Sequence, residues 1–142
     1  MVITLIRFAL IAPIGDAGTE PTPPIGLAYL ASACKGPGID VKGIDAAGKN
    51  LNKTFKIPKY KLRGNGIEID EIIKLIDKKT EIIGISAMFS HEWPYVRDCI
   101  NLIKDNFPKV VIFAGGEHVT ALPEYCLRDC KAINYICLGE GE

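Results

Sequence analysis

Residues 110–116 read Val110-Val111-Ile112-Phe113-Ala114-Gly115-Gly116. The first five are apolar throughout, without the polar alternation of a strand that keeps one face in water. Such a run is typical of a parallel sheet with both faces covered by helices. The segment Glu81–Ala87 repeats the pattern with Ile82, Ile83 and Ile85. Together these two segments predict an α/β domain.

Strands and helices alternate along the rest of the chain. The expected strands are Leu5–Ala12, Asp40–Asp45, Glu81–Ala87, Val110–Ala114 and Asn134–Leu138. The expected helices are Pro24–Lys35, Asp70–Lys79, Glu92–Asn106 and Ala121–Cys130. Right-handed crossovers leave few arrangements for this order, so we predict a flavodoxin-like (Rossmann-like), doubly wound, five-stranded parallel sheet with strand order 2-1-3-4-5. A final helix after Leu138 is absent, which should leave part of one sheet face without a cover.

Helical spacing and end signals support these boundaries. One apolar side is expected from Ile72, Ile73, Leu75 and Ile76, and another from Val96, Ile100 and Ile103. The expected start and stop signals are Asp70 as an N-cap, Pro94 in a first turn, Gly36-Pro37-Gly38 after the first helix and Pro108 after the third.

Composition limits the class of protein. The chain has 142 residues, of which 48% are hydrophobic and 24% charged, enough to bury a core and too apolar for disorder. Seventeen basic residues balance seventeen acidic ones, so no overall charge attracts nucleic acid or a membrane. Arg7 interrupts the apolar N-terminus, which argues against a signal peptide or a membrane anchor. Five cysteines without a CxxC pair indicate reduced thiols and a cytoplasmic location.

The segment Lys49–Arg63 departs from this balance. It carries five lysines and Arg63 and no acidic residue. We interpret it as a solvated loop after the second strand, and a phosphate or RNA contact is the alternative.

Function is expected in the loops that follow the strands, because open parallel sheets bind ligands outside the carboxyl ends of their strands. These loops are Pro13–Pro23, Met88–His91, Gly115–Thr120 and Gly139–Glu142. Gly115-Gly116 removes two β-carbons where a ligand could approach the backbone, although an isolated pair of this kind is more often a tight strand-to-helix turn.

Several familiar sites do not match these loops. Residues 13–19 contain a proline and one hydroxyl, a poor phosphate cradle for a flavin. No P-loop, GxGxxG or GxSxG motif occurs. Cys126, Cys130 and Cys137 lack the spacing of an iron–sulfur site and fit a core role. His91 and His118 follow strand ends, where a capping or hydrogen-bonding role is more common than metal ligation, and two histidines alone cannot complete a zinc site.

Four segments together resemble the N-terminal cobalamin-binding domain of cobalamin-dependent radical S-adenosylmethionine enzymes. They are Pro23-Pro24-Ile25-Gly26-Leu27-Ala28-Tyr29-Leu30-Ala31, Ile83-Gly84-Ile85-Ser86-Ala87-Met88, Gly115-Gly116-Glu117-His118-Val119-Thr120-Ala121-Leu122-Pro123-Glu124 and Gly139-Glu140-Gly141-Glu142. The resemblance covers essentially the whole chain, as one domain of residues 1–142.

The resemblance implies that the corrin ring lies across the carboxyl edge of the sheet, with the nucleotide tail beside the glycine loops. Ser86-Ala87-Met88 matches the Ser-x-Leu element of cobalamin modules, with Met88 as a departure, and Gly115-Gly116 matches their Gly-Gly. Gly18 stands where other cobalamin modules carry a cobalt-ligating histidine, which implies base-off binding without that ligand. The implied cofactor-binding residues are Pro13, Pro24, Gly26, Ser86, Ala87, Met88, Phe89, Gly115, Gly116, His118, Thr120, Gly139 and Glu140.

The family's catalytic half follows the Gly-Glu-Gly-Glu segment and carries a 4Fe–4S cluster and S-adenosylmethionine. This chain alone is therefore expected to bind cobalamin without catalysing a reaction, as part of a methyltransferase acting on an unactivated carbon. Its expected partners are its own downstream catalytic domain or a second copy at the uncovered sheet face. The alternatives are a non-catalytic interaction or sensory module of the same fold, or a flavin-binding electron-transfer domain.

Overall fold

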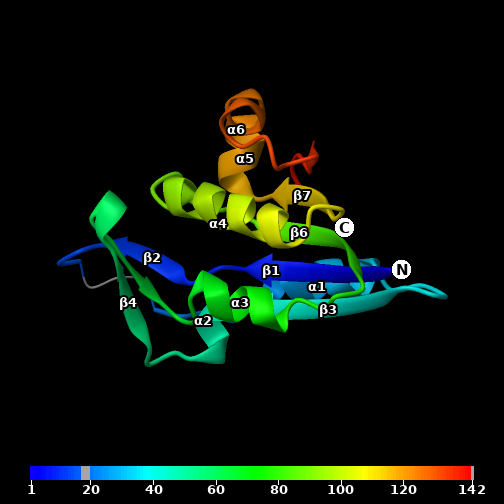
Figure 1. Ribbon diagram of the computed structural model, residues 1–142, viewed down its shortest axis with the longest axis horizontal. Helices are drawn as coiled ribbons and strands as arrows, with labels where there is room; N and C mark the ends of the chain where they lie inside the picture. Colours follow the sequence, from blue (N-terminus) through cyan, green and yellow to red (C-terminus); the bar gives the residue numbers. More distant parts are fainter. Residues whose placement is uncertain (17–19, 142) are drawn as a thin grey trace.

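A five-stranded parallel sheet forms the centre of the protein in a computed structural model that describes residues 1–16 and 20–141 (Figure 1). Its strands, in spatial order, are β3 (Asp40–Asp45), β1 (Val2–Arg7), β6 (Thr80–Ser86), β7 (Val111–Gly115) and β8 (Tyr135–Ile136). All neighbouring pairs are parallel. Numbered within this sheet alone, the order is 2-1-3-4-5, and the predicted flavodoxin-like topology is confirmed.

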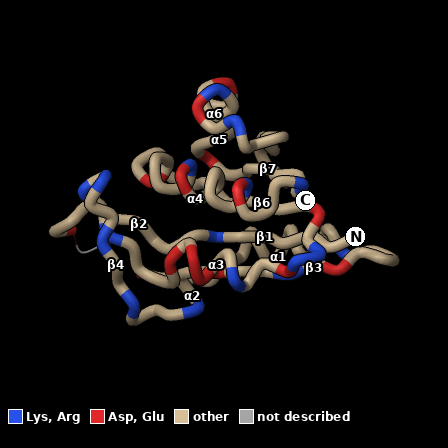
Figure 2. The backbone as a smooth tube through the Cα atoms, viewed as in Figure 1, with Lys and Arg blue, Asp and Glu red and all other residues tan. Residues whose placement is uncertain are grey.

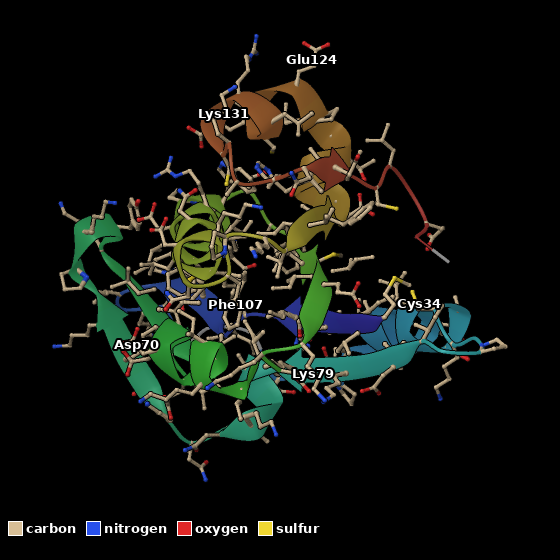
Figure 3. The ribbon with its side chains drawn as sticks, turned by 45° about the vertical axis from the view of Figure 1, so that its right-hand side comes forward. Cys34, Asp70, Lys79, Phe107, Glu124 and Lys131 are labelled. Carbon is tan, nitrogen blue, oxygen red and sulfur yellow. The ribbon has the colours of Figure 1, made fainter. Side chains whose placement is uncertain are left out.

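Helices lie on both faces of the sheet. They are α1 (Ile25–Ala33), α2 (Ala46–Lys49), α3 (Ile69–Leu75), α4 (Trp93–Asn106), α5 (Glu117–Ala121) and α6 (Pro123–Asp129). Figures 1 and 3 show α3 and α4 on one face and α1 on the other, with α5 and α6 beside β7 and β8. Ile83, Ile112 and Ala114 are fully buried beneath the first pair of helices.

The core is densest under α4. Val96, Ile100 and Ile103 are buried at the spacing of one helix side, as predicted. For α3 the prediction was partly wrong, because Leu75 is 46% exposed and the helix ends there instead of at Lys79. Its N-cap is Glu68, not Asp70, and the Glu68 amide donates to the Glu71 carboxylate at 3.1 Å.

A second sheet corrects two predictions. The expected first strand, Leu5–Ala12, is two strands, of which β2 (Leu10–Pro13) leaves the main sheet. It pairs antiparallel with β5 (Leu62–Asn65), and β5 pairs with β4 (Thr54–Ile57) across a short 3-10 helix, η1 (Pro58–Tyr60). The basic segment Lys49–Arg63 is therefore not a solvated loop, because it contains β4, η1 and the start of β5. Its lysine and arginine residues lie along this second sheet (Figure 2).

Shorter corrections concern element ends. The predicted helix Ala121–Cys130 is divided at Leu122, where α5 ends and Pro123 begins α6. The first helix covers Ile25–Ala33 instead of Pro24–Lys35. The last strand has two residues, because only Tyr135 and Ile136 pair with β7.

One face of β6, β7 and β8 is covered by no helix from residues 1–16 or 20–141, and we name it the open face. In register order it carries Gly84, Phe113 and Tyr135 in one row across the three strands. Phe113 is 37% exposed and Tyr135 57%, and their rings stack with centroids 4.9 Å apart. The uncovered apolar face expected from the sequence is therefore present. After β8 the chain returns toward the Cys34 end of α1 (Figure 3).

Helix α1 packs against β1 and β3, yet none of its residues is fully buried. Ile25 and Tyr29 are 65% and 62% exposed. The helix thus adds apolar surface on the side of the sheet that carries the open face (Figure 3).

No helix in residues 1–16 and 20–141 is long and apolar enough to cross a bilayer.

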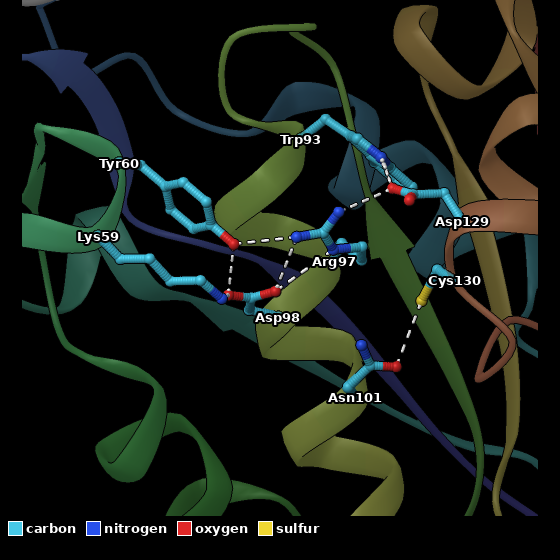
Figure 4. Close-up of polar contacts among 8 residues, drawn as sticks. All are labelled: Lys59, Tyr60, Trp93, Arg97, Asp98, Asn101, Asp129 and Cys130. Atoms are coloured by element: carbon cyan, nitrogen blue, oxygen red, sulfur yellow. Dashed lines mark hydrogen bonds and ion pairs between the residues drawn. The ribbon is translucent and has the colours of Figure 1, made fainter.

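A polar network joins the second sheet to α4 and α6 (Figure 4). The Arg97 guanidinium donates to Asp129 at 3.0 Å and to the Tyr60 hydroxyl at 2.9 Å, and it contacts Asp98 at 3.2 Å. The Trp93 indole donates to the same Asp129 carboxylate. Arg97 therefore fixes η1 and α6 on opposite sides of α4.

All five cysteines are free thiols. Cys99, Cys126 and Cys130 are buried, and burial raises the pKa of Cys99 to about 12 and of Cys126 to about 11. Cys34 and Cys137 are half-buried.

Candidate ligand site at the carboxyl edge

Four residues line up across the carboxyl end of the main sheet: Asp45, Arg7, Ser86 and Gly115, which are successive register partners on β3, β1, β6 and β7. We name them the edge row. The Arg7 guanidinium donates to Asp45 at 2.9 Å and to the Thr22 carbonyl at 2.7 Å. The charged half of the row is thereby engaged within the protein, and its other half carries only a hydroxymethyl group and a hydrogen atom.

The segment Met88–Glu92, which we name the edge loop, follows β6. Met88 is 40% exposed and Phe89 is 51% exposed. Figure 1 shows α4 beginning at the end of the molecule where the main-sheet strands end, so the loop that precedes this helix lies at the same edge. Two exposed apolar side chains therefore stand where parallel sheets bind ligands.

Side chains hold the edge loop on two sides. Ser90 Oγ and His118 Nδ1 are 2.9 Å apart, which ties the loop to α5. His91 Nε2 and the Ile11 carbonyl are 3.0 Å apart, and the Ile11 amide donates to Glu92 at 3.3 Å, which ties the loop to β2. Burial raises the pKa of the Glu92 carboxyl.

The two glycines after β7 differ in their surroundings. Gly116 has φ 117° and ψ 173°, a conformation almost confined to glycine, and a β-carbon there would lie 2.6 Å from the Ala87 carbonyl oxygen. A β-carbon on Gly115 would make only an ordinary contact, 3.6 Å from Cys137 Cβ. Gly116 is therefore required by the turn, whereas Gly115 leaves room beside Ser86.

His118 lies in the interior. It is 5% exposed, and its ring centroid lies 5.0 Å from that of Trp93. Nε2 is buried without a hydrogen-bond partner among the described residues. Burial lowers the pKa of the ring, because removal from water disfavours the charged imidazolium.

The remaining predicted site residues fall into three places. Pro24 and Gly26 begin α1, and Ala87 is buried at the start of the edge loop. The Gly139 amide donates to Thr120 Oγ1 at 3.2 Å, which brings the glycine-containing C-terminal segment, with exposed Glu140, beside α5. Pro13 lies apart from these, since it pairs with Leu62 in the second sheet. Gly18 lies outside the described residues.

Several residues of this edge and of the adjoining open face were not predicted as site residues from the sequence: Arg7, Asp45, Gly84, Ser90 and Cys137. A signal was available for Arg7, the lone cation in an apolar run, because such a charge normally needs a partner. Gly84 carried another, since a single glycine inside an apolar strand run indicates a close approach of other atoms. In the structure a β-carbon there would lie 2.7 Å from Leu5 Cδ2.

These residues suit a large, flat, partly apolar ligand. The edge row and the open face combine small residues at Gly84, Ser86 and Gly115 with the exposed Phe113 ring. In the described part of the chain no three His, Cys, Asp or Glu side chains are placed to hold a bare metal ion.

Comparison with known proteins adds relatives of this domain. Over 120 residues the chain is 36% identical to an uncharacterized methyltransferase of Pyrococcus horikoshii, which covers 84% of this chain and 22% of that protein. Over 123 residues it is 28% identical to the cytidylyl-2-hydroxyethylphosphonate methyltransferase of Streptomyces wedmorensis, which covers 85% and 23%. The chain thus spans about a fifth of the length of these relatives.

A solved structure shares the fold. It is a cobalamin-binding protein from Desulfitobacterium hafniense, with a TM-score of 0.59 and 15% identity, and the match covers 96% of this chain and 52% of that one. The model of the B12 binding domain family matches residues 13–142. The chain therefore belongs to the B12 binding domain family.

Proposed function

We propose that this domain binds cobalamin at the edge row and the open face, base-off, on behalf of a radical S-adenosylmethionine methyltransferase. The observation that carries the proposal is the absence of bulky side chains at Ser86 and Gly115, directly beside the exposed aromatic pair Phe113 and Tyr135. Membership in the B12 binding domain family supports the ligand, and the methyltransferase names of two relatives support the reaction class.

Each part of the site would have its own role. The Met88 and Phe89 side chains offer apolar contact to a macrocycle, and Ser86 offers a hydroxyl to its polar substituents. Gly115 leaves space beside Ser86 on the open face for a tail, whereas the Leu5 side chain fills the space over Gly84. Cobalamin supplies a methyl group that can be passed to another atom, and the domain itself binds, orients and shields the cofactor.

Base-off binding without a histidine ligand is the second part of the proposal. Both histidines of the chain have protein partners, His91 at the Ile11 carbonyl and His118 at Ser90. Electron paramagnetic resonance of Co(II) cobalamin bound to the chain should show no superhyperfine splitting from an axial nitrogen. Such splitting would contradict this part alone.

Catalysis is assigned to another domain. The 4Fe–4S cluster and S-adenosylmethionine would belong to a downstream catalytic domain, since the two relatives are about four times as long as this chain. We propose that the catalytic domain, or a second copy of the present chain, contacts the open face. The substrate carbon would be selected by the catalytic domain, outside these 142 residues.

Cofactor binding can be tested directly. The chain is incubated with hydroxocobalamin and desalted, and the eluted protein should carry the visible spectrum of a corrin. A protein that elutes colourless, or with a flavin spectrum after purification, would contradict the proposal.

A matched pair of variants locates the site. Gly115→Val should weaken cobalamin binding, because its side chain would enter the space beside Ser86. Gly43→Val on β3 is the control, since a β-carbon there meets no atom within 4 Å and neither glycine has a positive φ. Equal loss of affinity in both, or in neither, would place the site elsewhere.

A further inference from the structure

We infer that His118 is a positioning residue: through Ser90 it holds the edge loop so that Met88 and Phe89 stay displayed at the carboxyl edge. The inference rests on the proposed function, because it gives the displayed side chains a ligand to meet. It assigns His118 an indirect role, since the ring lies behind the loop with 5% of its surface exposed.

The contact between α5 and the edge loop is specific. His118 offers one ring nitrogen to Ser90 at 2.9 Å, and its other ring nitrogen is buried without a partner among the described residues. If the side chain at position 118 only filled space, an apolar residue would stabilise the fold more than histidine does, because burying an unpaired nitrogen is unfavourable. The bond to Ser90 is thus the feature that a phenylalanine of similar size could not supply.

The edge loop has a second anchor on β2. The His91 and Glu92 side chains bind the carbonyl and the amide of Ile11, so they occupy both backbone polar groups of that residue. Phe89 stacks on the His91 ring with centroids 5.8 Å apart and planes 25° apart. Two elements distant in sequence therefore hold a loop whose own apolar side chains are exposed.

Hydrogen bonds are needed to hold the edge loop in one conformation, because its apolar side chains are exposed. Met88 and Phe89 gain little from burial in the ligand-free protein, so burial alone would not keep them in place. A loop fixed before the ligand arrives loses less conformational freedom on binding, which strengthens binding. The hydrogen bond at Ser90 is therefore expected to affect affinity through loop order.

Two variants separate the hydrogen bond from the ring. His118→Phe keeps a ring to pack on Trp93 and removes the bond to Ser90. His118→Asn keeps a polar atom close to the position of Nδ1 and removes both the ring and the unpaired nitrogen. Ser90→Ala removes the bond from the other side, and Leu102→Gln, at an exposed position on α4, is the control.

Two measurements are made on the 142-residue chain. Amide hydrogen exchange of the ligand-free protein should be faster across Met88–Glu92 in His118→Phe and Ser90→Ala, and close to the parent in His118→Asn and Leu102→Gln. Affinity for hydroxocobalamin should fall about tenfold in His118→Phe and Ser90→Ala, as expected for the loss of one hydrogen bond. In His118→Asn and Leu102→Gln it should stay within about twofold of the parent affinity.

The outcomes distinguish the two ideas. If the parent chain fails to bind hydroxocobalamin, the proposed function fails, and the exchange data still decide whether His118 orders the loop. If His118→Phe leaves loop exchange unchanged, or if His118→Asn loosens the loop as much as His118→Phe does, the positioning role is wrong. Faster exchange without any change in affinity would also overturn it.

Discussion

The Trp93 indole nitrogen donates to Asp129 Oδ2 at 2.9 Å, which joins the first turn of α4 to the last turn of α6. Trp93 is 3% exposed, so its N–H has no access to bulk water. Burial alone would raise the pKa of Asp129, but hydrogen bonds from Trp93 and Arg97 lower it. The carboxylate is therefore expected to be ionised at neutral pH and to stabilise both helices.

Removal of this carboxylate should be costly. Asp129→Ala leaves the buried Trp93 N–H without an acceptor, and we expect a loss of about 2 kcal/mol in the free energy of unfolding. Urea unfolding followed by Trp93 fluorescence measures it. Asp105→Ala, at an exposed position on α4, the helix of Trp93, should change the free energy by less than about 0.5 kcal/mol. Equal effects would show that the indole bond contributes nothing.

The two glycines after β7 should respond differently to alanine. Gly116→Ala forces a β-carbon against the Ala87 carbonyl in a backbone conformation that strains any side chain. We therefore expect the free energy of unfolding to fall by about 1–3 kcal/mol. Gly115→Ala meets only an ordinary contact and should stay within about 0.5 kcal/mol of the parent. Thermal and urea unfolding of both variants decide the matter. A Gly116→Ala chain as stable as the parent would refute the turn geometry.

Buried His118 should make stability depend on pH. Its folded pKa is lowered by burial below its ordinary value of 6.5, so just below pH 6.5 the unfolded chain binds more protons than the folded one. The free energy of unfolding should therefore fall as pH falls from 6.5 toward the folded pKa, and level off below it. The difference between the parent and His118→Asn, measured in urea from pH 7.5 to 5, isolates this part. A difference constant with pH would contradict it.

The open face should bind apolar probes. Phe113 and Tyr135 are exposed side by side, and larger apolar patches commonly mark interaction sites. We expect the chain to bind a hydrophobic dye and to self-associate in concentrated solution. Tyr135→Ser should reduce both, as measured by dye fluorescence and sedimentation. A strictly monomeric parent chain without dye binding would argue against an interaction at this face.

The sequence was sufficient for the parallel sheet because its strands are buried on both faces. Runs such as Val110–Ala114 allow few other environments, and topology rules restrict their order. The second sheet was missed because its strands are half-exposed and carry lysines. The alternation of Thr54-Phe55-Lys56-Ile57 was the available signal, and the charge of the segment obscured it.

The candidate site was predictable where a residue type is demanded by the backbone or by proximity to a strand end, as at Gly116 and Ser86. Contacts between distant segments were not predictable. Nothing in the sequence around Ile11 indicates that His91 and Glu92 would bind its backbone, because that contact depends on how β2 leaves the main sheet.

The cysteines make this domain a natural subject for site-directed labelling. Three thiols are sequestered and hard to ionise, so maleimides and other thiolate-selective reagents should react first at Cys34 and Cys137. Cys137 adjoins Gly115, with its β-carbon 3.6 Å from the place where a Gly115 β-carbon would stand. In a Cys34→Ser background, the alkylation rate of Cys137 would report occupancy of the open face without any engineered probe.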